Sequence, residues 1–415
     1  MIFAKEPSAD WRAMASEWQQ HWRVGLASFL VLGLSQGAFQ SLFSLFIIPL
    51  QTAFGWSRGQ IALAYNATLA TALLAPFFGY VIDKYGARRI MLSGLIASAC
   101  VYAGLAMMSG PIWIFYLLHV AAASVGLSTS GLTCSRVVSA TFVKSRGLSL
   151  ALARSGYALA SAGLPVVMFS LIMMFGWRAG YVMEAALVLA VALPATYFWI
   201  DNKSLEVTAS PAGKAPSASA LALVRDRRIW ILCFGALLSY APANALMSQL
   251  HPILTGKGVS PLAAAKFIGV AGIASFLGAI VTGILVDRFW APAIACLFSI
   301  GAAVGSLILM FSPALLPAQA FLSTALTGLG LGAELDVVAF LVARYFGIKL
   351  FSTAYGIAIF FIAAGGAAGA SALGLSFDHY NSYDPALGFL ALSFCLSGIV
   401  YLMLGPYPTV NEHDA

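Results

Sequence analysis

Charged residues are scarce in this chain of 415 residues. Only 9% of the residues are Asp, Glu, Lys or Arg, whereas about a quarter is usual in soluble domains. Apolar residues make up 61% of the chain. This composition excludes a soluble globular protein, and it predicts an integral membrane protein whose main surroundings are the lipid bilayer.

Patterns that bind metals or cofactors are also missing. The five cysteines lie in five different apolar runs, and no two of them form a C-x-x-C pair. We therefore expect neither a disulfide framework nor a metal site. The glycine-rich residues 328–334 lack the lysine of a phosphate-binding loop, and no nucleophile–base set is evident, so we expect no cofactor and no enzyme activity.

Long apolar runs dominate the chain instead. A helix that crosses a bilayer needs about 20 apolar residues, and twelve runs reach this length. Their approximate bounds are 23–50, 57–82, 88–108, 112–140, 146–173, 178–199, 229–254, 261–286, 291–311, 315–344, 351–375 and 385–405. The sequence thus predicts an all-α polytopic protein with twelve transmembrane helices.

A polar stretch divides the twelve runs six and six. Residues 200–227 are rich in Ala, Ser and Pro and basic at their end, which is typical of a flexible linker. The expected organisation is an N-terminal segment (1–22), a first six-helix bundle (23–199), a linker (200–228), a second six-helix bundle (229–405) and a tail (406–415).

The distribution of Lys and Arg predicts the orientation. With an even number of spans, both ends of the chain lie on one side of the membrane. Of the 22 Lys and Arg residues, four lie on the opposite side and two within spans, which leaves sixteen on the side of the termini. The four are Arg58, Arg178, Lys257 and Lys266, and the two are Arg136 and Arg154. Positive residues mark the cytoplasmic side, so we expect cytoplasmic termini, a bacterial inner membrane and no nucleic-acid partner.

Two short motifs repeat between the halves. G-Y-V-I-D-K at 79–84 corresponds to G-I-L-V-D-R at 283–288, with an offset of 204 residues. The glycine pair Gly147 and Gly156 corresponds to Gly356 and Gly365, with an offset of 209 residues. Two matches at nearly one offset, on either side of the linker, indicate that the second half duplicates the first.

The first motif resembles the signature loop of the major facilitator superfamily. Its residues here are Gly79, Asp83, Lys84, Gly86, Arg88 and Arg89, and its degenerate copy supplies Gly283, Asp287 and Arg288. The resemblance implies two pseudo-symmetric six-helix bundles that rock about a central site. It also implies that these charged residues gate the cytoplasmic side. The alternative interpretation is a stop signal that only fixes topology.

Several longer segments resemble bacterial monocarboxylate-porter-like and oxalate/formate-type carriers. They are residues 54–64, 145–163, 175–181, 250–260 and 328–356. The resemblance implies transport of a small organic anion, often together with a proton. Those carriers often use an arginine in the eighth span, but the corresponding span here has no cation before Arg288. The family's substrate anchor therefore cannot be carried over to this chain.

Charges within the spans suggest a replacement for that anchor. Arg154 lies ten residues from Lys144, roughly 15 Å along a helix and near the membrane midplane. Its planar guanidinium suits a carboxylate, so we interpret Arg154 as an anion anchor. A structural arginine bonded to carbonyls or an acid is the alternative. Arg136 is shallower and is interpreted as a gate residue, or as a side chain that reaches the surface.

Two carboxylates lie in the tenth span. Glu334 and Asp336 are two residues apart, so they face different sides of a helix and only one can point straight at a central cavity. We interpret the pair as proton-coupling groups, because an acid inside the membrane can bind a proton. The alternatives are a salt bridge to Arg136 or Arg154, and a structural acid.

Neutral polar residues on the spans complete the candidates. The proposed substrate ligands are Gln36, Gln40, Asn66, Tyr240 and Asn244, with Gln249 as a further candidate. Hydrogen bonding between helices is the alternative role for these side chains. Glu184 is expected about two turns below the outer surface, as a cap or a coupling group. His119 is expected as a core residue or a proton relay, and His251 as a solvated residue at the outer end of its span.

These observations predict a proton-linked secondary carrier of a monocarboxylate or aromatic acid, acting as a monomer. An exporter or a carrier of a neutral solute or drug is the first alternative. A non-transporting membrane receptor with the same fold is the alternative from another class.

Overall fold

The computed structural model describes all residues except 1–10, 143–144, 202–222, 224, 287 and 408–415. Within the described part, every regular element is a helix. The first half contains α1 (Trp11–Leu32), η1 (Gly33–Gly37), α2 (Ala38–Phe54), α3 (Arg58–Leu63), η2 (Ala64–Ala67), α4 (Thr68–Tyr85), α5 (Ala87–Met107), α6 (Ile112–Gly126), η3 (Leu127–Thr129), α7 (Gly131–Thr141), α8 (Arg146–Phe175), α9 (Trp177–Leu187), η4 (Val188–Ala192) and α10 (Leu193–Trp199). The second half contains α12 (Arg227–Gly256), α13 (Pro261–Val286), α14 (Ala291–Phe311), α15 (Pro317–Tyr380) and α16 (Asp384–Leu402).

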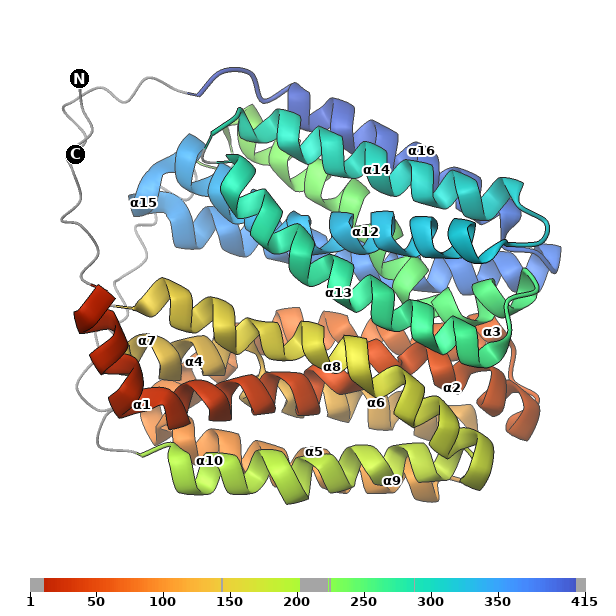
Figure 1. The fold of residues 1–415 in the computed structure, drawn as a ribbon, viewed down its shortest axis with the longest axis horizontal. Coiled ribbons are helices and arrows are strands. Elements are labelled where there is room, and N and C mark those ends of the chain that lie inside the picture. Colours follow the sequence, from red (N-terminus) through yellow and green to blue (C-terminus); the bar gives the residue numbers. More distant parts are fainter. Residues whose placement is uncertain (1–10, 143–144, 202–222, 224, 287, 408–415) are drawn as a thin grey trace.

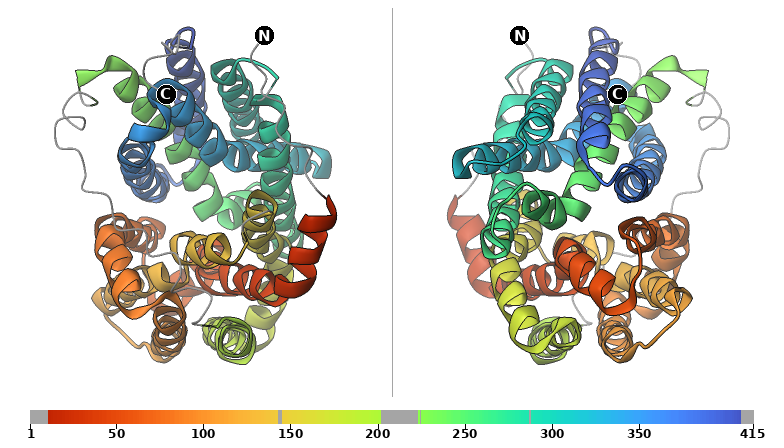
Figure 2. Two further views of the ribbon diagram at one scale, coloured as in Figure 1. Left: turned by 90° about the vertical axis from the view of Figure 1, so that its left-hand side faces the viewer. Right: turned by 90° about the vertical axis from the view of Figure 1, so that its right-hand side faces the viewer.

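Eleven described helices are long and apolar enough to cross a membrane. The remaining predicted run, 57–82, is also helical, but it is divided into α3, η2 and α4. The all-α class with twelve membrane helices is therefore confirmed. The helices form two pseudo-symmetric halves, which Figure 1 shows as a lower layer (α1–α10) and an upper layer (α12–α16). The end-on views of Figure 2 show the same separation.

The spans give the molecule two ends. We call the end near Gly86, Ser145, Trp199 and Asp226 the linker end, which lies at the left in Figure 1. The other end, near Gly55, Pro111, Gly176, Gly258 and Asn381, is called the far end.

Helix α15 differs from the sequence prediction. Two spans separated near 344–351 were expected, but the backbone stays helical from Pro317 to Tyr380. A straight helix of its 64 residues would be about 96 Å long, three times the bilayer core. The ribbon instead turns back at the linker end, so that α15 supplies two spans, Pro317–Phe346 and Ala354–Tyr380.

Small residues bring the two halves into contact. Gly272 on α13 faces Ser161 on α8, where a Cβ added at Gly272 would lie 2.8 Å from the Ser161 Cβ. Gly269 on the same helix faces the Ala162 carbonyl, at 2.5 Å from its added Cβ. Small side chains let membrane helices approach closely, and here they place the backbone of α8 directly against the second half.

Candidate functional site

An ion pair joins the two halves. The guanidinium of Arg154 on α8 lies 3.8 Å from the carboxylate of Asp336 on α15. Their side chains are 57% and 41% exposed, respectively, so both groups can be reached by solvent or a small ligand. Arg154 and Asp336 come from opposite halves, so a ligand that separates them acts on the contact between the halves.

One tyrosine interacts with both groups of this ion pair, and two more tyrosines are linked to it in turn. Tyr355 on α15 interacts electrostatically with both Arg154 and Asp336. It also interacts with Tyr240 on α12, which in turn interacts with Tyr157 on α8. Tyrosines of both halves are therefore electrostatically linked to the ion pair, directly for Tyr355 and through it for Tyr240 and Tyr157.

Two hydrogen bonds between the halves lie on the far-end side of the tyrosines. The hydroxyl of Tyr65 in η2 donates to the Asn244 side-chain oxygen on α12, at 2.9 Å. The Ser371 hydroxyl on α15 donates to the Asn66 side-chain oxygen, also at 2.9 Å. The structure thus brings four candidates together between the halves, namely Asn66, Tyr240, Asn244 and the pair-forming Arg154.

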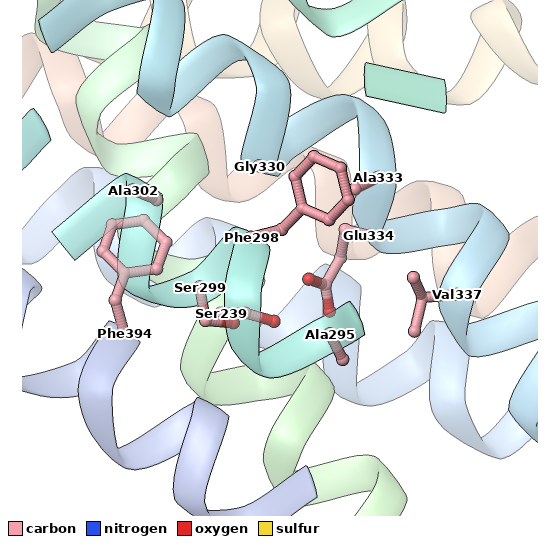
Figure 3. Close-up of a pocket in the computed structure, with 10 residues that line it drawn as sticks. All are labelled: Ser239, Ala295, Phe298, Ser299, Ala302, Gly330, Ala333, Glu334, Val337 and Phe394. Carbon is pink, nitrogen blue, oxygen red and sulfur yellow. The ribbon is translucent and has the colours of Figure 1, made fainter. Parts of the chain in front are cut away.

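Glu334 has different surroundings from Asp336. Its side chain is buried inside the second half, where the Tyr401 hydroxyl donates to its carboxylate at 2.9 Å. Figure 3 shows it in a small pocket that also includes Ser239 and Phe298. The spacing of two residues therefore separates the two acids as expected, with Asp336 between the halves and Glu334 within one of them.

The two glutamines line a separate space within the first half. We call this space the first-half pocket; its lining includes Gln36, Phe39, Gln40, Phe43, Tyr65, Thr68, Tyr102 and His119. Both glutamines are partly buried, and neither Arg154 nor Asp336 belongs to the described lining of this pocket. The structure thus places the substrate-ligand candidates in two regions, not one.

One expectation from the sequence was wrong. His251 was expected to be solvated, but it is buried, with its ring Nε2 3.3 Å from the Pro261 carbonyl, because neighbouring helices cover this end of the span. Glu184 is 1% exposed, and neither carboxylate oxygen has a hydrogen-bond partner among the described residues, which does not fit a cap at the surface. Its alternative role as a coupling group remains a prediction.

The signature-loop residues lie at the linker end. Asp83 and Lys84 lie in the last turn of α4, before Gly86 with φ +85°. Arg88 donates to the Tyr197 carbonyl at 2.7 Å, which ties α5 to α10 within the first half. Arg89 and Arg288 are exposed, whereas Asp287 lies outside the described residues. A gating role for these residues, and for the exposed Arg136, remains a prediction.

The site also contains residues that sequence reasoning missed. Tyr65, Tyr157 and Tyr355 were not candidates, because tyrosines are common in membrane helices and nothing in their spacing sets them apart. One signal was available: Tyr157 lies three residues after Arg154, on nearly the same face of α8. Among the described residues, no group of three or more His, Cys, Asp or Glu could hold a metal ion.

Two helical halves with a charged, tyrosine-lined contact between them define a membrane transporter of the two-bundle class. The family model of the Major Facilitator Superfamily matches residues 28–370, and the chain belongs to this family. It is 23% identical over 392 residues to the uncharacterized MFS-type transporter YcxA of Bacillus subtilis, covering 92% of this chain and 94% of that protein. It is 25% identical over 414 residues to monocarboxylate transporter 11 of Mus musculus, covering 92% and 87%.

The fold is shared with solved structures. The nucleoside transporter NupG superimposes with a TM-score of 0.76 and 13% identity, over 93% of this chain and 99% of that chain. At this identity, the similarity establishes the fold alone. The family and its fold are those of transporters and not of enzymes.

Proposed function

We propose that the chain is a proton-coupled secondary carrier of a small organic anion that works by alternating access. The observation that carries this proposal is the Arg154–Asp336 pair. A charge inside a membrane is costly unless it has a partner or faces water, and such charges mark transport pathways. This pair links one charge of each half and is partly exposed, so it can be exchanged for a bound ligand.

The guanidinium would bind the carboxylate of the substrate. Arg154 offers a planar fork that matches a carboxylate in two hydrogen bonds. The incoming carboxylate displaces that of Asp336, which then takes up a proton. One anion and one proton therefore enter the site together, and its net charge does not change. Glu334 is a second proton-coupling candidate, placed behind the site by its hydrogen bond to Tyr401.

Contacts at the far end support alternating access. The hydrogen bonds Tyr65–Asn244 and Ser371–Asn66 join the halves on that side of the ion pair. The exposed ion pair is therefore reached from the linker end, which the Lys and Arg distribution assigns to the cytoplasm. The bundles 23–199 and 229–405 would rock about this site, with the signature loops and Arg136 gating the linker end. We propose a monomer in a bacterial inner membrane, with both termini cytoplasmic.

The relative monocarboxylate transporter 11 favours an anion over a neutral solute as cargo. The residues agree with this choice, because one cation that can be exchanged suits one carboxylate. The tyrosines around it provide apolar faces for the remainder of a small organic acid.

The test is uptake of labelled mono-, di- and aromatic carboxylates into proteoliposomes, with and without an inward proton gradient. We expect gradient-stimulated uptake of a monocarboxylate, lost in Arg154→Gln and weakened in Arg154→Lys, which keeps the charge but not the fork. Lys266→Gln is the matched control, since Lys266 is an exposed cation near the far end of α13. If no acid is carried by folded protein, or if Arg154→Gln behaves like Lys266→Gln, the proposal is overturned.

A further inference from the structure

The first span departs from α-helical geometry next to the helix that carries Arg154. Its middle is η1, a π-helical turn in which Ser35 has the non-helical angles φ −101° and ψ −106°. Single π-turns inside α-helices are rare, and they are often found at functional sites. The turn η1 is therefore a candidate functional element of the first half.

The glycines at both ends of η1 lie directly against α8. A Cβ added at Gly33 would lie 2.6 Å from the Gly156 carbonyl oxygen, and one added at Gly37 would lie 2.8 Å from the Tyr157 ring. A Cβ added at Gly156 would in turn meet the carbonyl oxygen of Phe29 in α1. Because backbone lies on backbone at this contact, the position of η1 determines the position of α8.

This contact lies beside the proposed anion anchor. Arg154 precedes Gly156 by two residues, which is about 3 Å along α8. Its guanidinium extends to the other half, where it lies 3.8 Å from the carboxylate of Asp336. Hydrogen-bond geometry is narrow, so a displacement of α8 by about 1 Å would change how well the guanidinium meets a carboxylate.

A buried hydrogen bond holds η1 to the fourth span. The hydroxyls of Ser35 and Thr129 lie 2.9 Å apart, and both side chains are 0% exposed. Thr129 ends η3, a 3₁₀ turn, so the bond joins two irregular turns. A buried hydroxyl that loses its partner is costly, and the bond therefore stabilises η1 in this geometry.

Structural packing is the other role that such contacts can have, because small residues let membrane helices associate. In that role, loss of the bond between Ser35 and Thr129 would lower the stability of the first half without altering the affinity for a ligand. A role in placing Arg154 would alter the affinity. The two roles therefore differ in a measurable quantity.

We propose that η1 is the positioning element of Arg154, and that Ser35 and Thr129 are its positioning residues. Their hydrogen bond holds η1 in place, and the glycines of η1 hold the backbone of α8. The helix then presents the guanidinium so that both hydrogen bonds of its fork reach the carboxylate of the substrate. This assignment rests on the proposed function, because it takes Arg154 as the anchor of that carboxylate.

The experiment is a double-mutant cycle between Ser35 and Arg154. The KM and the maximal rate of uptake into proteoliposomes are measured for the full chain, with the labelled carboxylate that the parent protein carries fastest. The variants are Ser35→Ala, Arg154→Lys and their combination, with Thr129→Val to test the other partner of the bond. The matched control is Ser306→Ala, since this hydroxyl is also 0% exposed but donates to the Ala302 carbonyl within α14.

We expect Ser35→Ala and Thr129→Val each to raise KM about tenfold, the contribution of one hydrogen bond of the fork, with little change in the maximal rate. In the Arg154→Lys background, Ser35→Ala should change KM by less than about twofold, because no fork is left to position. Ser306→Ala should leave KM unchanged in both backgrounds. Thermal unfolding in detergent follows the folding of each variant.

Two glycines of α8 test the contact itself. In Gly156→Ala, the new methyl group meets the Phe29 carbonyl, so KM should rise at least as much as in Ser35→Ala. Gly163→Ala is the matched control on the same helix, since nothing lies within 4 Å of a Cβ added there. Its KM should equal that of the parent protein.

Two results would overturn the positioning role. One is an equal effect of Ser35→Ala on KM in both backgrounds, and the other is a loss of stability at unchanged KM. In either case, uptake that still depends on Arg154 leaves the proposed function standing. If the parent protein carries no carboxylate, or if Arg154→Lys and Arg154→Gln do not alter uptake, both proposals fail together.

Discussion

The carboxylate of Asp378, near the end of α15, accepts a hydrogen bond from the backbone N–H of Gly59 in the first turn of α3, at 2.8 Å. The Ser57 hydroxyl donates to the same oxygen. An acid of the second half therefore caps a helix of the first half, where the free N–H groups and the dipole favour negative charge. There is no room for a side chain at residue 59, since an added Cβ would meet this carboxylate.

Replacing Asp378 should open the far end. A helix cap contributes about 1 kcal/mol, equivalent to about fivefold in an equilibrium between closed and open far ends. In Asp378→Ala, we expect a cysteine placed at buried Ser371 to react about fivefold faster with a membrane-impermeant thiol reagent, in a background without the five native cysteines. In Asp378→Asn, the reactivity of this cysteine should lie between those in the parent protein and in Asp378→Ala, because the amide oxygen still accepts hydrogen bonds.

The matched control for this experiment is Asp384→Asn. Asp384 is a far-end carboxylate that pairs with Lys257 at 2.5 Å, within the second half. Its loss should leave the reactivity of Ser371→Cys unchanged. Equal reactivity in Asp378→Ala and Asp384→Asn would show that the Asp378 contact does not hold the halves together.

Removing the acid of the ion pair should separate substrate movement from proton movement. Asp336→Asn cannot bind a proton, so net uptake should no longer respond to an inward proton gradient. Exchange of labelled for unlabelled acid should continue, because Arg154 still binds the carboxylate. Net uptake and exchange are both measured in proteoliposomes, for Asp336→Asn and for Glu334→Gln in parallel. Gradient-stimulated uptake that persists in Asp336→Asn and disappears in Glu334→Gln would assign the coupling role to Glu334 instead.

The tyrosine contact at the far end should not respond to pH in the physiological range. Burial raises the pKa of Tyr383 to about 12, against the opposing effect of Arg58. Its hydroxyl accepts from Arg58 at 3.1 Å and donates to Gln249 at 3.0 Å. The neutral hydroxyl is favoured in the folded protein, so its contribution is present below about pH 10 and is lost as the pH rises through about 12.

We therefore expect the reactivity of Ser371→Cys to be constant between about pH 6 and 9, after correction for the thiol's own ionisation. In Tyr383→Phe it should be higher at every pH in this range by a constant factor. A reactivity that changes steeply with pH in the parent protein and not in Tyr383→Phe would contradict this account.

Packing within the second half predicts a stability difference between two glycines of α15. A Cβ added at Gly332 would lie 1.8 Å from the Ser275 carbonyl oxygen, whereas at Gly356 nothing lies within 4 Å. Gly332→Ala should destabilise the protein by about 1–3 kcal/mol through overpacking. Gly356→Ala should be neutral or slightly stabilising, as alanine favours a helix. Thermal unfolding in detergent measures both, and similar values for the two variants would refute the close approach of α13 and α15.

The sequence predicts the fold largely because the membrane restricts it. Apolar runs of helix length leave few architectures, and the repeated G-x-x-x-D step indicates the two halves. The continuous α15 was missed because polar residues near 344–351 resemble a loop, although a helical backbone can carry them. The pairing of Arg154 with Asp336 was one of several possibilities, since periodicity gives the face of a helix but not its neighbour.

The remaining parts of the site depend on tertiary contacts that leave no local pattern. The bond between Ser35 and Thr129 joins residues 94 positions apart. The contact of Asp378 with Gly59 joins residues 319 positions apart. Neither can be read from spacing, because each depends on how distant helices meet.

Helix α15 carries both Asp336, at the contact between the halves, and Asp378, at the far end, in one continuous helical element. If the binding of an anion in place of Asp336 shifts α15, the same element links that shift to the cap on α3. Such coupling is reciprocal by thermodynamic necessity. Any change at the far end that weakens the Asp378 cap should therefore change the affinity of Arg154 for its anion. The factor should equal the one by which the bound anion weakens the cap.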